Sequence, residues 1–374
     1  MSKLLKEAAL LLIISSITRF VSSQDKIFSN DYREITFKSC YGFIADVGNK
    51  NDLLIRAHIK PIEFDFSRPI KIRYSWQKVL PNVEKGIYLR YVNLENPEYL
   101  GSLYVVSPFI KATVINTRFW KLRLSSSMGL VYASKIYHRT ENYRNDIFGS
   151  HVNIAVAFAI DNSFSISKKV TISAGIDFSH FSNGETTLPN SGMNNGTMFL
   201  SVGYHFENQK DTNIYKLTDN VTNRIRKFAI ITAIGWKDLS PVKSSKYLTT
   251  ALSLEFGLPV TELQKVGAGA VIFYDGSMRS LYRADIEDGI ESGNSYRQLT
   301  AGIYIFHDLN LYPLILHIET GYFLIEDRVP GRSDVFNRFG IRYYLNNHFF
   351  INFLHKSHFF FKGDNLEWGT GIIF

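Results

Sequence analysis

The stretch 248-LTTALSLEFG-257 alternates large apolar side chains with small or polar ones. The stretch 266-VGAGAVIFYD-275 has the same period of two, which is the period of a β-strand rather than of a helix. The second face of each stretch is too small and too polar for a packed core, whereas a soluble sandwich would bury its large apolar face and expose Lys and Glu. The pattern therefore favours strands of a barrel with an apolar outside and a polar lumen.

About sixteen segments of this kind follow one another from Ser39 onward, each ended by a polar turn. They lie near residues 39, 61, 86, 100, 122, 151, 170, 197, 228, 247, 265, 297, 314, 336, 348 and 366. Because closing a barrel removes every strand edge, we predict an all-β fold in which residues 24–374 form one transmembrane antiparallel barrel of the outer membrane, with about 14 to 16 strands. An eight-stranded barrel with a second β unit beside it is the alternative.

One polar segment, Glu207–Arg226, is the candidate domain boundary. We interpret it as a loop within the barrel, because it lacks the Pro and Gly enrichment of a linker. The chain ends with the alternating stretch 366-LEWGTGIIF-374. A last strand that stops on an aromatic residue is similar to the C-terminal signal of outer-membrane barrels. Both chain ends of the predicted barrel would then face the periplasm.

Composition excludes several other classes of protein. The chain has 374 residues, 45% hydrophobic and 20% charged, with a net charge of +8 and a single cysteine, Cys40. One cysteine permits neither an internal disulfide nor a multi-thiolate zinc site. Residues 1–23 have a basic start, an apolar stretch and small residues before Gln24, so we predict a cleaved signal peptide. No apolar run of 18 residues follows, which excludes spanning helices in the mature chain.

The strand expected over Val170–Ser182 carries the candidate catalytic pair. Its even-numbered residues form the apolar face, and His180 and Ser182 continue that face, so both side chains are expected to point outward, toward lipid. Same-face neighbours along a strand lie about 6.6 to 7 Å apart at Cα, which lets an imidazole reach a hydroxyl. His180 can then act as general base for Ser182 as nucleophile. By itself a His-x-Ser spacing is weak evidence, since such residues near a membrane interface commonly bond to loops and water.

This segment also resembles the active-site segment of the PagL-type lipid A 3-O-deacylases, in particular their longer relatives, the acyloxyacyl hydrolases. The matching motifs are 180-HFSNG-184 and Pro189-Asn190-x-Gly192-x-Asn194, together with Gly149-Ser150-His151-x-Asn153 and Tyr41-Gly42-Phe43-Ile44. The resemblance covers residues 39–206 and leaves 227–374 as an extension of the barrel. It implies an esterase in the outer membrane of a Gram-negative bacterium, acting toward the outer leaflet. Such an enzyme hydrolyses the 3-position ester of lipid A and releases a 3-hydroxy fatty acid.

The resemblance also implies roles for individual residues. His180 and Ser182 match the family's base and nucleophile, and Asn183 with Gly184 supplies the expected oxyanion donors. The short enzymes of the family carry Glu at the position of Asn194. An amide oxygen can orient an imidazole but cannot stabilise the imidazolium with a full negative charge. Glu185 is the nearest carboxylate and is the alternative acid.

Basic residues precede His151 in the expected loop, where a cationic rim would hold the phosphates of lipid A. These head-group candidates are Lys135, Arg139 and Arg144, although loops of a basic protein carry such residues without that role as well. His151 has the parity of the lumen face, which favours a structural role. The chemistry requires no cofactor, and we expect no metal site. Expected partners are lipopolysaccharide and the outer-membrane assembly machinery, with no nucleic acid, while the oligomeric state is left open.

Two other functions are compatible with the sequence. Asn194 favours a barrel that has lost catalysis and serves as a structural or lipid-binding protein. A barrel of about sixteen strands could also leave an open lumen and act as a porin-like channel. The outward direction of His180 and Ser182 argues that the chemistry does not use such a lumen.

Overall fold

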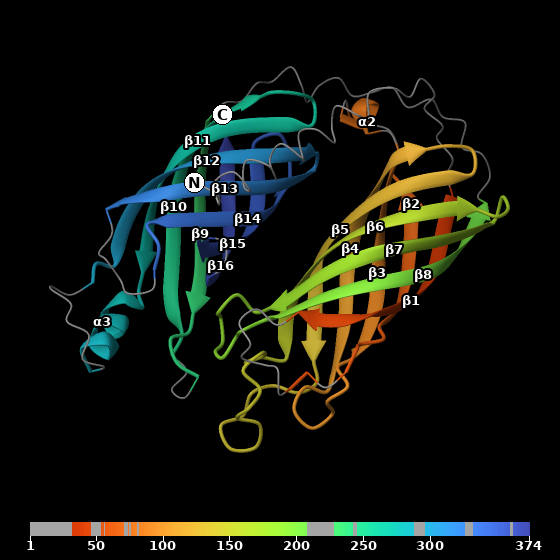
Figure 1. Ribbon diagram of the computed structural model, residues 1–374. Coiled ribbons are helices and arrows are strands. Elements are labelled where there is room, and N and C mark those ends of the chain that lie inside the picture. The colour runs from red at the N-terminus through yellow and green to blue at the C-terminus, as the bar shows by residue number, and fades with distance from the viewer. Residues whose placement is uncertain are drawn as a thin grey trace, which may run out of the picture.

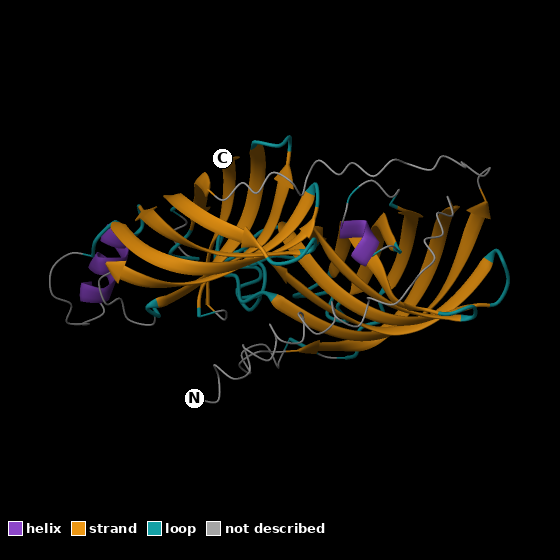
Figure 2. Ribbon diagram, turned by 90° about the horizontal axis from the view of Figure 1, so that it is seen from above, coloured by secondary structure: helices purple, strands orange, loops and turns teal. Residues whose placement is uncertain are grey.

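The computed structural model describes residues 32–45, 54–55, 57–70, 74, 76–80, 82–207, 228–241, 245–287, 296–325, 332–359 and 362–374. The expected signal peptide, residues 1–23, lies outside the described residues. Among the helices that are described, none is long and apolar enough to cross a bilayer. Most of the described chain is antiparallel β-structure, arranged as two units side by side (Figures 1 and 2).

The first unit, called here the first barrel, is a closed barrel in which each strand pairs with its neighbours in sequence. Its strands are β1 (Tyr32–Ala45), β2 (Ile62–Pro69), β3 (Val83–Asn93), β4 (Ser102–Asn116), β5 (Trp120–Ala133), β6 (Val152–Ser165), β7 (Val170–Ser182) and β8 (Met193–Glu207). Closure comes from β1 and β8, which pair from Tyr32 opposite Glu207 to Ala45 opposite Asn194. A short helix, α2 (Trp76–Val79), lies between β2 and β3.

The second unit, the second barrel, closes in the same way by pairing β9 with β16. Its strands are β9 (Phe228–Lys237), β10 (Tyr247–Pro259), β11 (Gln264–Asp275), β12 (Leu299–Leu311), β13 (Leu314–Ile325), β14 (Val335–Tyr344), β15 (Phe349–His358) and β16 (Lys362–Ile373). The helix α3 (Met278–Glu287) follows β11. It lies on the side of this barrel that faces away from the first barrel (Figures 1 and 2).

The sixteen strands therefore form the alternative arrangement, an eight-stranded barrel with a second β unit, rather than one barrel of 14 to 16 strands. Residues 227–374 do not extend the first barrel. The edge of β8 is already paired with β1, so no free edge remains for β9. The boundary between the units falls between Glu207 and Phe228, which corrects our interpretation of Glu207–Arg226 as a loop within one barrel.

The alternation of side chains is as the sequence indicates. On β10 the outward Leu252 and Leu254 are 47% and 57% exposed, whereas the inward Ser253 and Glu255 are 1% and 3% exposed. A large apolar outer face and a polar lumen are the reverse of a soluble sandwich and are typical of barrels that span a membrane.

Side chains fill the lumen of the first barrel. The Arg90 guanidinium binds Glu63 at 2.5 Å and both oxygens of Asp177 at 2.8 and 3.0 Å, and Lys38 also pairs with Glu63. The space left among these groups is about 20 Å³, which is close to the volume that one water needs. An eight-stranded barrel is only wide enough for its own side chains. This lumen gives no support to a porin-like channel.

The two barrels meet at both ends. At the end with short turns, the indole Nε1 of Trp76 in α2 donates to the carbonyl of Tyr312 at 3.3 Å, and Trp76 packs with Leu263 and Leu311. At the opposite end, the segment 183–192 that joins β7 to β8 reaches the second barrel, as described below. Longer connections gather at this second end, which is typical of the extracellular side of outer-membrane barrels.

Candidate active site

His180 and Ser182 lie near the end of β7 with their side chains on the outer face of the first barrel. Both are partly exposed, whereas Ser179 and Phe181, which point into the lumen, are 0% and 1% exposed. The strand period alone imposes this direction, because β7 runs without a bulge from Val170 to Phe181 opposite β8. The outward orientation expected from the sequence is the one that the structure has.

Asn194 stands directly opposite His180 across the β7–β8 pair. The distance from His180 Nδ1 to Asn194 Oδ1 is 2.8 Å. An amide oxygen only accepts hydrogen bonds, so Nδ1 carries the hydrogen and Nε2 keeps its lone pair. The contact therefore holds the imidazole in the tautomer that a general base requires.

Gly192 leaves open the space that His180 and Ser182 share. A Cβ added to Gly192 would lie 3.2 Å from both His180 Cε1 and Ser182 Cβ, and the residue has a φ of +69°. Glycine is the residue that adopts such a φ without strain and without filling the space. The sequence motif contains Gly192, but spacing alone gave it no role.

Asn183 organises the segment 183–192. Its side-chain Nδ2 donates to Ser150 Oγ at 2.9 Å and to the carbonyl of Thr187 at 2.8 Å, and its backbone N–H donates to Asn190 Oδ1 at 3.0 Å. These bonds commit all three of its donor hydrogens, so Asn183 does not serve as the oxyanion donor that we expected. Gly184, the second expected donor, follows at a φ of +60°.

Glu185 faces the second barrel rather than His180. Its carbonyl accepts the N–H of Asp238 at 3.0 Å. Burial, reinforced by the charge of Asp364, raises the pKa of the Glu185 carboxyl to about 7. Its strongest charged neighbours are Asp364, Lys237, Lys362 and Arg332, in the second barrel. Glu185 is therefore not placed to act as the alternative acid, and Asn194 occupies His180 Nδ1 instead.

The connection between β5 and β6, residues 134–151, borders the same site. It carries the expected head-group residues, which are exposed: Lys135, Arg139 and Arg144. The carbonyls of Asp146 and Ile147 in this connection accept the N–H groups of Ser191 and Gly192 at 3.0 and 3.3 Å. The basic residues thus belong to a segment that is bonded to the one after Ser182.

His151 does not point into the lumen, in contrast to its sequence parity. It precedes β6, which begins at Val152, so the alternation of that strand does not extend to it. Its ring stacks on the outward Tyr132 with a centroid distance of 5.2 Å, and its Nδ1 donates to the carbonyl of Ala133 at 2.7 Å. This arrangement fits the structural role that we expected.

Three residues of the second barrel approach the site, and sequence analysis identified none of them. Lys246 Nζ donates to Thr187 Oγ1 at 2.7 Å. Leu366 on β16 lies against Gly184, and its cross-strand neighbour His355 lies beside Glu185, since both approach the Cβ position of Gly363. These residues could not be identified from the sequence because they are far from His180 along the chain, and only the packing of one barrel on the other brings them close.

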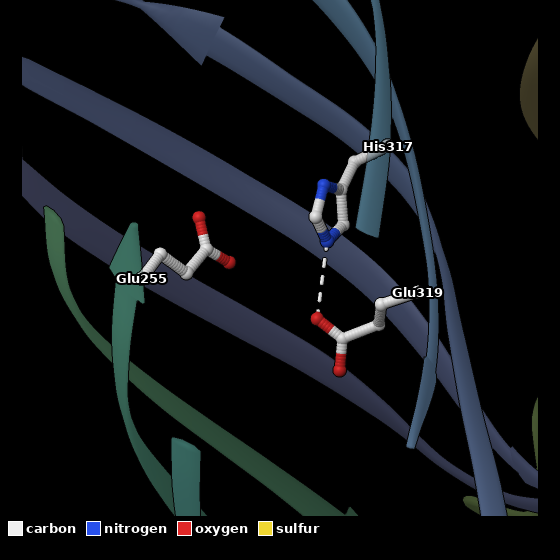
Figure 3. A group of neighbouring side chains, drawn as sticks. All are labelled: Glu255, His317 and Glu319. Atoms are coloured by element: carbon white, nitrogen blue, oxygen red, sulfur yellow. Dashed lines mark hydrogen bonds and ion pairs between the residues drawn. The ribbon is translucent and has the colours of Figure 1, made fainter. Parts of the chain in front are cut away.

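The lumen of the second barrel contains a group of possible metal ligands, Glu255, His317 and Glu319 (Figure 3). Their donor atoms are already paired. His317 bonds Asp308 through Nδ1 at 2.6 Å and Glu319 through Nε2 at 3.1 Å, while the Arg342 guanidinium binds both oxygens of Glu255 at 2.7 and 2.6 Å. Arg342 also lies 3.0 Å from His317 Nε2. A guanidinium at this position neutralises the group, so the residues fit an ion-pair network rather than a cation site.

Family comparisons agree with the division into two barrels. The family described as lipid A 3-O-deacylase (PagL) matches residues 63–204, and the family described as acyloxyacyl hydrolase, C-terminal domain, matches residues 226–374. The first match falls within the first barrel and the second contains the whole second barrel. No curated protein sequence matches the chain.

Two solved structures illustrate the extent of structural similarity. The crystal structure of the outer membrane enzyme PagL has 16% sequence identity and a TM-score of 0.33, with 44% of this chain and 97% of that chain covered. The crystal structure of Neisserial surface protein A has 13% identity and a TM-score of 0.32, with 48% and 98% covered.

The two sequence matches, each over about 40% of the chain, show this similarity more clearly than the structural scores do. The two sequence matches confirm the resemblance that the motifs around His180 indicated. The chain is therefore similar in its first barrel to the family described as lipid A 3-O-deacylase (PagL), and in its second barrel to the family described as acyloxyacyl hydrolase, C-terminal domain.

Proposed function

We propose that this protein hydrolyses the ester at the 3-position of lipid A from the outer leaflet. In this proposal Ser182 is the nucleophile, His180 is the base and Asn194 orients the base. The observation that carries the proposal is the 2.8 Å contact between His180 Nδ1 and Asn194 Oδ1. It supports a role for His180 Nε2 as proton acceptor on the side of the barrel that meets acyl chains.

The reaction begins when Ser182 Oγ attacks the ester carbonyl and its proton passes to His180 Nε2. The backbone N–H of Gly184 is the donor that we assign to the oxyanion of the tetrahedral intermediate. When the intermediate collapses, the bond to the sugar 3-oxygen breaks, and His180 returns the proton to that oxygen. Water, activated in turn by His180, then hydrolyses the acyl-Ser182 ester and releases the 3-hydroxy fatty acid.

Asn194 provides orientation without a charge. The imidazolium formed during each half-reaction is therefore stabilised less than it would be by a carboxylate. A slow but active hydrolase is the expected consequence. The exposed Lys135, Arg139 and Arg144 supply cationic groups for the phosphates of lipid A, in a segment bonded to Ser191 and Gly192.

The test uses full-length protein in vesicles that contain lipid A, with mass spectrometry of the lipid. Loss of one 3-hydroxyacyl group with the wild type, and not with Ser182→Ala or His180→Ala, is the expected result. Ser126→Ala is the matched control, because Ser126 lies between lumen-facing residues on β5 and opposite the outward Phe158, away from the site. This control should keep the wild-type rate.

A catalytically silent barrel is the competing function, and Asn194 is the residue that favours it. Unchanged lipid A with folded wild-type protein, at pH 6 to 9 and at high protein-to-lipid ratio, would replace the hydrolase by this alternative. Activity that survives in Ser182→Ala would instead show that another group is the nucleophile.

A further inference from the structure

The segment 183–192 links Ser182 to Asn194 through a backbone that is unusually dependent on outside support. Three of its residues have positive φ values: Gly184 at +60°, Glu185 at +61° and Gly192 at +69°. Glu185 is not a glycine, and such a φ persists for an L-residue only where surrounding contacts maintain it. The conformation that follows Ser182 is therefore set by what packs against it.

The first barrel holds the later half of this segment. Asn190 Oδ1 accepts the N–H of Asn183, and the carbonyls of Asp146 and Ile147 accept those of Ser191 and Gly192. These bonds fix the position of Gly192 beside the candidate base.

The second barrel holds the earlier half. The N–H of Asp238 donates to the carbonyl of Glu185 at 3.0 Å. Lys246 Nζ donates to Thr187 Oγ1 at 2.7 Å and also to the carbonyl of Thr186. Both groups belong to the connection between β9 and β10, so one short connection of the second barrel bonds three consecutive residues of the segment.

An apolar contact lies beside these bonds. Leu366, outward on β16, lies so close to Gly184 that a Cβ added there would be 2.5 Å from Leu366 Cγ. Its cross-strand neighbour is His355, on the same outer face. The tip of His355 lies 3.3 Å from the Cβ position of Gly363, and Glu185 Cγ lies 3.7 Å from the same point. This face of the second barrel thus covers the residues next to Ser182.

We propose that the second barrel is a positioning element of the hydrolase site, acting through Lys246 and Leu366 on the segment 183–192. This inference rests on the proposed function and extends it to the role of the second barrel. Lys246 and Leu366 do not touch the reacting atoms in this scheme. They keep Gly184 and Ser182 in the arrangement that attack on the ester requires, because a displaced segment misplaces both the nucleophile and the oxyanion donor.

Steady-state kinetics on the full-length protein in lipid A vesicles test the proposal. Lys246→Met removes the donor but keeps the apolar stem, and we expect kcat to fall about 5- to 10-fold with KM changed by less than about 2-fold. Lys246→Arg, which can still donate to Thr187 Oγ1, should restore most of kcat. Arg279→Met on α3 is the matched control for loss of one exposed cation of the second barrel.

Leu366→Ala tests the apolar contact and should also lower kcat several-fold. Its control is Ile372→Ala, because Ile372 lies on the outer face of the same strand and is 40% exposed. Wild-type kcat in both Lys246→Met and Leu366→Ala would overturn the proposal. Equal losses in the two controls would overturn it as well, since the effect would then be a general one on the barrel.

Hydrogen exchange separates this inference from the proposed function. The amides of Asp238, Thr186 and Ser191 should exchange faster in Lys246→Met and Leu366→Ala than in the wild type, while the strand amides of both barrels keep their protection. Exchange needs no catalytic turnover. If the wild type is inactive but exchange rises in the two variants as expected, the hydrolase is refuted and the second barrel still positions the segment 183–192. If exchange in the two variants equals that of the wild type, the positioning role itself is refuted.

Discussion

Substitutions of Asn194 separate the two effects that an acceptor has on a catalytic histidine, which are orientation of the ring and stabilisation of its charge. Asn194→Leu keeps the size of the side chain and removes the acceptor. Asn194→Asp keeps the acceptor and adds a negative charge. In the wild type the contact with His180 is a neutral hydrogen bond of 2.8 Å. Such a bond contributes about 1 kcal/mol net, and one to a charged group about 1.5 to 3 kcal/mol.

The imidazolium exists in the transition state and not in the resting enzyme, so these differences act on kcat. Loss of about 1 kcal/mol in Asn194→Leu corresponds to a kcat about 5-fold lower. A gain of about 1 to 2 kcal/mol in Asn194→Asp corresponds to a kcat about 5- to 30-fold higher. The expected order of rates is Asp above Asn above Leu.

The assay is the initial rate of 3-hydroxy fatty acid release from vesicles with saturating lipid A. Asn162→Leu is the matched control, because Asn162 is an exposed residue of β6 that binds Trp120 at the other end of the barrel. An Asp variant no faster than the wild type would refute the argument about charge. A Leu variant as fast as the wild type would refute any orienting role for Asn194.

Three further outcomes follow from the same geometry. Gly192→Ala forces a φ of +69° on an L-residue and brings a Cβ to 3.2 Å from His180 Cε1 and Ser182 Cβ. At roughly 1 to 2 kcal/mol of strain, kcat should fall about 5- to 30-fold, while the folded barrel keeps its heat-modifiable migration on a gel. A wild-type rate would contradict this. The pKa of Glu185 is about 7, against an ordinary value of 4.5. The segment 183–192 therefore docks on the second barrel most strongly below pH 4.5, and its docking weakens by at most about 3 kcal/mol as pH rises through 7. Hydrogen exchange of the Asp238 amide should rise with pH relative to a Glu185→Gln variant, and a constant ratio of the two exchange rates would exclude this linkage. Arg90→Met leaves the buried Glu63 and Asp177 without their guanidinium and should lower the stability of the first barrel by about 3 to 5 kcal/mol, seen as a lower urea midpoint in detergent; an unchanged midpoint would mean that the lumen reorganises.

Much of the fold could be predicted because the alternation of side chains within each strand shows which face is apolar and which is polar. The alternation at Leu252–Glu255 gives the outward and inward sides directly, and the sixteen segments counted in the sequence correspond to the sixteen strands of the described chain. Alternation does not show which two strands pair with each other to close a barrel. A barrel of sixteen strands and two barrels of eight have the same local pattern, and the pairing of β1 with β8 decides between them.

The site divides in the same way. The direction of His180 and Ser182 follows from strand parity, and Asn194 lies opposite His180 because β7 and β8 form a hairpin of fixed register. The roles of Asn183 and Glu185 could not be derived from spacing. Both lie in a segment between strands, where no period applies, and their partners Ser150 and Asp238 come from other connections.

The sequence by itself determined the class of fold, the outward face that carries His180 and Ser182, and the resemblance to the PagL-type enzymes, because strand period and a short motif are local properties. Tertiary structure alone decided that there are two barrels and that Glu185 points away from His180. It also decided that Lys246 and Leu366 contact the segment 183–192. The physical reason is that closure of a barrel and packing between barrels depend on edges and surfaces far apart in the chain. No local pattern of residues encodes those contacts.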